Sequence, residues 1–380
     1  MGAGRSPDRH SLLLLGAPAL THHTEGRTSS PPEVDGDHVV FSLSDPDRVC
    51  REVRLLQEIS RPRSGPRFEH NGSALWRLRW TKPPVGRFEY AFEVSYRDGR
   101  AETICDPANP ITVSGPFGDK SVMELPGYRP PDWLHGEAEP GPQRRIQLAS
   151  PGLRRSLEVL LWATPGATED EPLPLLVAHD GPELARSSGL IGYLEHLYAA
   201  GRVPPLRAAL LAPVDRDESY SASTSYARAL AHHFLPALNE IAPVPRERSM
   251  RVGMGASLGA LAMLHVHRLH PASFGGLFLQ SGSFFRSRLD RQESEFPRFV
   301  RICRFVGRVS STPDWVHPVP ISMTCGTAEE NLANNRLLST ALRAQGYEVN
   351  LAEHPDAHNW VSWRDAFDPH LGNLLAAAWL

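Results

Sequence analysis

A serine flanked by glycines is the feature that most constrains how this chain can fold. The sequence Gly255-Ala256-Ser257-Leu258-Gly259 has the pattern G-x-S-x-G. Residues 251–254 before it predict a strand, and residues 257–270 predict a helix. A serine at such a strand-to-helix turn presents its hydroxyl outside the chain, because small neighbours permit the strained backbone. The pattern alone is short and arises by chance, so the strand and helix around it carry the prediction that Ser257 is a nucleophile.

Predicted strands and helices alternate over residues 144–380. Several strands are continuous apolar runs, which are typical of parallel sheets covered on both faces. The alternation predicts a doubly wound, mostly parallel sheet, and with the serine turn it predicts an α/β-hydrolase catalytic domain. The expected strands are 157–162, 173–178, 208–213, 251–254, 276–280, 319–324 and 349–353. The expected helices are 190–200, 226–241, 257–270 and 331–345, with a last one at the C-terminus.

The residues before this domain have a different pattern of apolar and polar residues. Apolar and polar residues alternate in stretches such as 74–80 and 88–94, and Asp98-Gly99 is a hairpin signal. We therefore predict a small all-β, immunoglobulin-like sandwich over residues 37–125. The proline- and glycine-rich residues 126–143 predict a linker. Residues 1–36 lack periodicity and predict a disordered tail.

The charge balance excludes several classes of function. A formal net charge of −3 predicts neither nucleic-acid binding nor a polybasic membrane contact. No apolar run approaches the length of a membrane span, and we expect a cytoplasmic protein. Four cysteines make no disulfide framework, although Cys50 and Cys105 could meet across the β-domain. We expect no cofactor and no metal, because His265, His267 and His270 scatter around one helix without a carboxylate or cysteine partner.

A nucleophilic serine needs a base and a group that orients the base. In this fold the chain order is serine, acid, histidine. His358 lies in a loop after the last predicted strand and is the expected base, with His354 as its nearest competitor. Glu329 and Glu330 both follow an earlier strand, so the residues themselves leave the acid open between them. Asp356 is so close to His358 in sequence that the geometry would be awkward.

Two further groups are expected at the site. The amide of Leu258 begins the helix after Ser257 and would donate to the oxyanion. Arg216 follows a predicted strand, where substrate loops gather in such sheets. It would bind an anionic or catecholate-rich substrate, or else form a surface salt bridge.

The chain resembles the enterochelin esterase family of α/β-hydrolases, which is related to esterase D and the mycolyltransferases. The resemblance runs from about residue 38 onwards. In such enzymes a small β-sandwich precedes the hydrolase domain, and the acid-bearing segment favours Glu329 over Glu330. The segments that carry the resemblance are Gly255–Leu261, Gln280–Phe284, Gly326–Glu329 with Asn335-Arg336, His358–Arg364 and, as the exit from the sandwich, Asp106–Pro110.

Two departures from the family pattern concern the site. Ala357 and Asn359 flank His358 where the family usually has glycine and often has aspartate. The second oxyanion donor should come from the loop His179–Glu183. Pro182 has no N–H, so Gly181 or Glu183 must serve, and we assign Gly181.

The resemblance implies hydrolysis of carboxylic esters through an acyl-enzyme. The family is best known for opening the tri-lactone of catecholate siderophores, so a small-molecule ester, such as a ferric siderophore, is the expected partner. Acyl transfer by the same triad is one alternative. A non-catalytic protein that binds a siderophore with the same fold is another. The sequence gives no oligomeric state.

Overall fold

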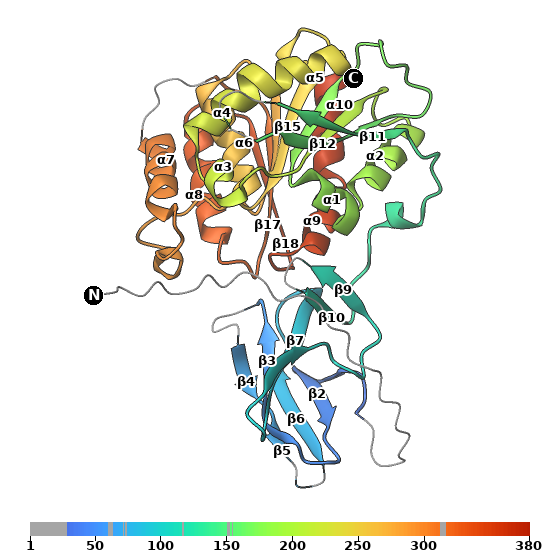
Figure 1. Ribbon diagram of the computed structural model, residues 1–380, viewed down its shortest axis with the longest axis vertical. Coiled ribbons are helices and arrows are strands. Elements are labelled where there is room, and N and C mark those ends of the chain that lie inside the picture. Colours follow the sequence, from blue (N-terminus) through green and yellow to red (C-terminus); the bar gives the residue numbers. More distant parts are fainter. Residues whose placement is uncertain are drawn as a thin grey trace, which may run out of the picture.

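The computed structural model describes residues 29–380 except 60–63, 71, 73, 116–117, 150–152, 154 and 312–316. Two all-β sheets lie at one end of the molecule, and a larger sheet with helices on both faces forms the rest (Figure 1). Among the described residues, no helix combines the length and apolar character needed to cross a membrane.

The N-terminal part consists of two mainly antiparallel sheets. The first has the order β1-β2-β6-β5, and the second β4-β3-β7-β10-β9 with β8 beside β7. Phe41, Tyr90 and Phe92 pack edge-on or tilted in one apolar core to which both sheets contribute. The strands are β1 (Glu33–Asp35), β2 (His38–Ser44), β3 (Cys50–Gln57), β4 (Ser64–Arg67), β5 (Glu69–His70), β6 (Leu75–Thr81), β7 (Arg87–Tyr96), β8 (Ala101–Ile104), β9 (Thr112–Gly115) and β10 (Gly118–Glu124).

The larger sheet has eight strands in the order β11-β12-β14-β13-β15-β16-β17-β18. Only β12 runs against its neighbours, so the sheet is mostly parallel. This is the α/β-hydrolase arrangement. The strands are β11 (Gln143–Leu148), β12 (Leu157–Ala163), β13 (Leu175–His179), β14 (Arg207–Leu211), β15 (Arg251–Ala256), β16 (Gly276–Gln280), β17 (Ile321–Gly326) and β18 (Val349–His354).

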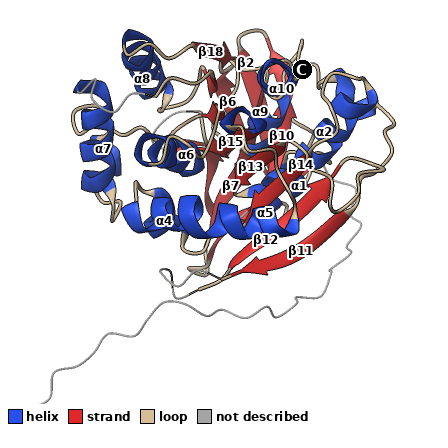
Figure 2. Ribbon diagram, turned by 90° about the horizontal axis from the view of Figure 1, so that it is seen from above, coloured by secondary structure: helices blue, strands red, loops and turns tan. Residues whose placement is uncertain are grey.

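Helices cover both faces of this sheet (Figure 2). Alternate residues of β13 enter two separate cores: Leu175 and Val177 pack on one face, and Leu176 and Ala178 on the other. Burial on both faces explains the continuous apolar runs in the sequence. One face carries α1 (Gly181–Ser187), α2 (Leu190–Ala199), α9 (Trp360–Asp365) and α10 (His370–Trp379). The other carries α3 (Arg216–Tyr220), α4 (Thr224–Ala229), α5 (Leu235–Ile241), α6 (Leu258–Leu269), α7 (Phe299–Ser311) and α8 (Leu332–Ala344).

The structure corrects several expectations. Strand β1 lies within residues 1–36, expected to be disordered, because its backbone extends the sheet beyond β2. The expected helix 226–241 is interrupted at Leu230–Phe234 by a π-helical turn, just before Pro236, whose ring cannot fit a regular helix interior. Within the expected linker, Trp133 is buried against α2. All four cysteines are free, so Cys50 and Cys105 form no disulfide.

Candidate active site

Ser257 occupies the turn between β15 and α6. Its backbone has φ 56° and ψ −122°, a region that L-residues rarely adopt and that signals local strain. The Ser257 amide donates to the Gln280 carbonyl at 2.9 Å, which ties the turn to the end of β16. The amide of Leu258 begins α6, where the first N–H groups of a helix lack helical partners. The turn therefore places a hydroxyl beside free backbone donors.

The glycines of the motif permit this close packing. A Cβ atom on Gly255 would lie 2.4 Å from the carbonyl carbon of Gly259, so only glycine fits there. A Cβ atom on Gly259 would lie 3.1 Å from the Cβ of His179, at the end of β13. The motif thus brings the first turn of α6 against the loop that follows β13.

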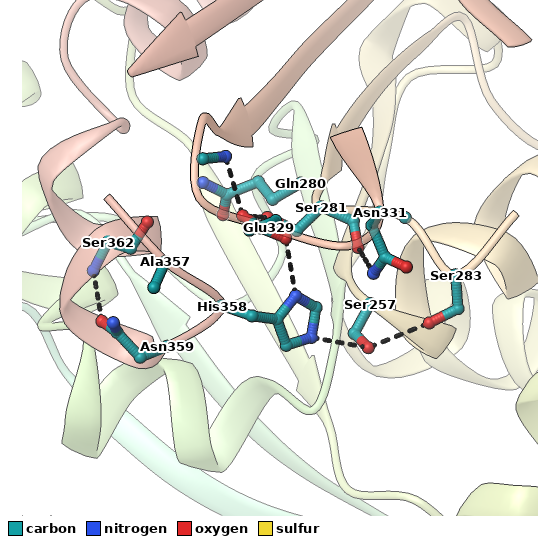
Figure 3. A network of polar contacts seen from close by, with 12 residues as sticks. Ser257, Gln280, Ser281, Ser283, Glu329, Asn331, Ala357, His358, Asn359 and Ser362 are labelled. Atoms are coloured by element: carbon teal, nitrogen blue, oxygen red, sulfur yellow. Dashed lines mark hydrogen bonds and ion pairs between the residues drawn. The ribbon is translucent and has the colours of Figure 1, made fainter. Parts of the chain in front are cut away.

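The structure brings together the three residues predicted as nucleophile, base and acid (Figure 3). His358 Nε2 lies 3.1 Å from Ser257 Oγ, and His358 Nδ1 lies 2.7 Å from Glu329 Oε2. Ser257 follows β15, Glu329 follows β17 and His358 follows β18, so all three lie at the carboxyl ends of strands. A tautomer with the proton on Nδ1 donates to Glu329 and leaves Nε2 free to accept the serine proton.

Glu329, and not Glu330, faces His358. Its side chain is fully buried and accepts from Ser281 Oγ at 2.6 Å and from the Gly326 amide at 2.7 Å. Burial alone raises the pKa of Glu329, but the adjacent His358 and these donors outweigh it, so the pKa lies below its usual value. The carboxylate is therefore ionised at neutral pH. Glu330 is exposed and accepts from Gln292.

The loop after β16 supplies supporting residues for which sequence reasoning predicted no individual role. Ser283 Oγ lies 3.1 Å from Ser257 Oγ, and the Ser283 amide donates to the Ser257 carbonyl. Ser281 Oγ accepts a hydrogen bond from Trp363 Nε1 and donates one to Glu329 Oε1. Asn335 bonds both backbone polar groups of Gly282. The sequence signal for these residues was their place in three family-like segments: Gln280–Phe284, Asn335-Arg336 and His358–Arg364.

The loop that carries His358 also contains Asp356 and Asn359. Asp356 does not contact the imidazole; its Oδ1 accepts from the Ala357 amide at 2.7 Å and from Asn359 Nδ2 at 3.4 Å. Asn359 Oδ1 accepts from the Ser362 amide at 2.8 Å and so caps α9. His354, the competitor for the base, instead bonds Ser362 Oγ.

Asp356→Asn is expected to remove a pH dependence of stability. Burial raises the pKa of Asp356 to about 7 from 3.8. The folded chain therefore holds a proton that the unfolded chain releases near pH 4, and this contribution to stability is lost as pH rises through 7. Between pH 5 and 8 the wild type should lose up to about 3 kcal/mol of unfolding free energy that the variant keeps. Urea unfolding at both pH values measures this. Exposed Asp35→Asn is the control, and equal pH slopes in Asp356→Asn and wild type would contradict the prediction.

The two residues expected to bind oxyanion and substrate follow neighbouring strands, Gly181 after β13 and Arg216 after β14. Gly181 begins α1, where a Cβ atom would clash with Leu210 at 2.3 Å. Arg216 forms a bidentate pair with Asp180, with distances from 2.8 to 3.1 Å. The structure therefore shows Arg216 in a salt bridge, which was the alternative to substrate binding. The roles of Gly181 and Arg216 stay predictions.

His179, the last residue of β13, is fully buried between the Gly259 carbonyl at 3.1 Å and Tyr226 Oη at 2.8 Å. Burial lowers its pKa to about 4, so it is neutral at pH 7. Its role is therefore structural: its hydrogen bond to the Gly259 carbonyl connects the end of β13 to α6.

The other histidines considered in the sequence do not converge on one site. His265 packs against Phe305, His267 bonds Tyr347, and His270 lies beside His232. Within the described residues, no group of three or more histidine, cysteine or acidic side chains has the geometry to hold a metal ion.

Comparison with curated proteins gives a consistent set of relatives, although no family model matches the chain. The chain is 27% identical over 216 residues to an iron(III) enterobactin esterase of Dickeya dadantii, covering 54% of this chain and 48% of that protein. It is 30% identical over 189 residues to one of Escherichia coli, covering 48% and 47%. The resemblance to the enterochelin esterase family is confirmed. The match spans about half the length of these enterobactin esterases.

Solved structures extend the likeness of fold to nearly the whole chain. The enterobactin esterase of Shigella flexneri, crystallised in the presence of enterobactin, has a TM-score of 0.73 at 22% identity, covering 93% of this chain and 96% of that one. An enterobactin esterase from Salmonella typhimurium has a TM-score of 0.73 at 20% identity, covering 93% and 97%. A ferulic acid esterase matches 62% of this chain and 99% of its own, with a TM-score of 0.54 at 16% identity. The chain therefore shares the fold of these esterases.

Proposed function

We propose that the chain is a serine esterase that hydrolyses carboxylic esters through an acyl-enzyme. The observation that carries this proposal is the continuous hydrogen-bonded series Ser257 Oγ, His358 and Glu329, at 3.1 and 2.7 Å. His358 would take the proton of Ser257 as Oγ attacks the ester carbonyl. The Leu258 amide, with Gly181 as second donor, would bind the oxyanion.

The remaining steps release the alcohol and then the acid, with His358 carrying the proton in each. Protonated His358 gives its proton to the departing alcohol, which leaves Ser257 acylated. Water then attacks the acyl-enzyme, and His358 takes its proton and returns it to Ser257 Oγ as the acid departs. Glu329 stays ionised and stabilises the charged imidazole in both halves.

We also propose a division of labour along the chain. Residues 37–125 would form an immunoglobulin-like sandwich, residues 126–143 a linker and residues 144–380 the catalytic domain. The tail, proposed as residues 1–36, lies mostly outside the described residues. Arg216 would contribute one edge of the substrate site while paired with Asp180.

The substrate class we propose is the tri-lactone of a catecholate siderophore. Support comes from the names of the curated relatives, iron(III) enterobactin esterases, and from the fold shared with structures of enterobactin esterases. The ferric complex would be the physiological substrate, and its iron is cargo.

A substrate panel tests this proposal. The purified protein is incubated with ferric enterobactin, iron-free enterobactin and a feruloyl ester, and products are separated by mass spectrometry with and without an added alcohol. We expect linear hydrolysis products from the lactones and slower turnover of the feruloyl ester. Transfer of the acyl group to the alcohol would favour the acyltransferase alternative. Stoichiometric binding without turnover of any ester would overturn the esterase proposal in favour of a binding protein.

A further inference from the structure

The all-β part contacts the loop that carries His358 on both sides of the histidine. On one side, the Gly86 amide donates to the Pro355 carbonyl at 2.7 Å. On the other, Arg87 Nη1 donates to Asn359 Oδ1 at 3.1 Å. Figure 1 shows the all-β part lying directly against the end of the larger sheet where β17 and β18 finish. The contacts therefore bracket the predicted base.

Asn359 uses its whole amide group in this contact. Its Oδ1 accepts from Arg87 and also from the Ser362 amide in the first turn of α9. Its Nδ2 donates to Glu58 Oε1 at 2.8 Å, just beyond β3. An aspartate here would lack the donor, and a serine would keep the helix cap but be too short to span both partners. Asn359, where the family often has aspartate, thus has an acceptor for Arg87 and a donor for Glu58 of the all-β part.

The contact residues are themselves held by a largely buried cluster of charges, in which the Lys120 side chain is 34% exposed. Lys120 Nζ lies 3.3 Å from Glu58 and 3.2 Å from Glu89, and Arg87, only 2% exposed, lies 3.6 Å from Glu89. Two cations therefore balance two carboxylates. Asp356 adjoins this cluster, and the cluster stays neutral when Asp356 is protonated. A balanced, largely buried cluster of this kind resists displacement, because moving one member leaves a buried partner unpaired.

We propose that Arg87, Glu58 and Asn359 form a clamp by which the all-β part holds His358 in position between Ser257 and Glu329. The proposal rests on the esterase function proposed above. It gives the β-part a role in the chemistry of the other domain. The three side chains are positioning residues, since they act on His358 through the loop: Asn359 follows His358 in the chain, and Arg87 and Glu58 bond Asn359.

The physical reason lies in the distances at the site. Proton transfer from Ser257 requires His358 Nε2 to stay within hydrogen-bond reach of Oγ, now 3.1 Å away. A misplacement of about 1 Å can cost ~100-fold in rate. The loop Pro355–Asn359 keeps hydrogen bonds of its own, such as that from the Ala328 amide to the Asp356 carbonyl at 3.1 Å. Loss of the clamp should therefore shift His358 within a folded loop and affect the transition state more than substrate binding.

Kinetics of Arg87→Met and Asn359→Ser test the clamp. We expect kcat to fall roughly tenfold or more in each, with KM within about twofold of wild type. Arg87→Lys keeps one donor and should restore part of kcat. Arg79→Met is the matched control: Arg79 lies on β6 in the same all-β part and makes only an exposed ion pair with Asp35. Its kcat should equal that of wild type.

Hydrogen exchange supplies a readout that needs no substrate. Amides of residues 354–359 should exchange faster in Asn359→Ser than in wild type, while those of α6 stay unchanged. A folded Asn359→Ser variant with wild-type kcat and wild-type exchange would overturn the clamp, including when Arg87→Met fails to fold. If the wild type turns over no ester, the esterase proposal fails, and hydrogen exchange still decides whether the clamp holds the loop.

Discussion

Replacing Ser257 by alanine is expected to lower kcat for ester hydrolysis by roughly 10⁴- to 10⁶-fold. The hydroxyl is the only group at the strained turn that can form the acyl-enzyme, so its removal leaves only the oxyanion donors and binding. The measurement is turnover of p-nitrophenyl acetate, together with covalent labelling by a fluorophosphonate probe. Both should be lost in the variant.

Ser283→Ala is the matched control for this experiment. Ser283 Oγ lies 3.1 Å from Ser257 Oγ, but His358 reaches only Ser257. The control should keep probe labelling, which then maps to Ser257 by peptide mass spectrometry. Turnover retained by Ser257→Ala in a folded protein would remove the basis of the proposed mechanism.

Glu329→Gln should lower kcat by about 10³- to 10⁴-fold, because the amide neither stabilises the imidazolium nor enforces the required tautomer. Glu330→Gln, at the adjacent residue, should stay close to wild type, since Glu330 is exposed and bonds Gln292, while His358 bonds Glu329. The two variants are compared by kcat/KM at pH 7 and by their melting temperatures. An equal loss in both would indicate that the carboxylate acts through folding and not through His358.

The parts of the fold that depend on local pattern were predictable from the sequence. The buried strands appear as apolar runs, and β15 with α6 appears around Ser257. Helix α7 was missed although its signal was present: its buried residues recur at helical spacing. Pattern also favoured His358 over His354. The choice of Glu329 over Glu330 needed the resemblance, because adjacent residues share every local signal.

The contacts that pattern does not encode were the ones that sequence reasoning missed. Ser283 is 26 residues from Ser257 in the chain, and Arg87 is 272 residues from Asn359. Neither residue has a local feature that names its partner. Such pairings follow from the strand order of the sheet and from how the all-β part sits against it, which a single sequence does not specify.

The separation between Arg87 and Asn359 has a consequence for how the protein matures. The strands around Arg87 emerge early in synthesis, whereas the loop of His358 lies near the C-terminus. Contacts between such distant segments form late in folding, because the loop they close must be ordered first. The base would therefore reach its place only after the all-β part and all strands of the larger sheet have been synthesised. During synthesis, Ser257 would therefore be present in the chain long before His358 could activate it.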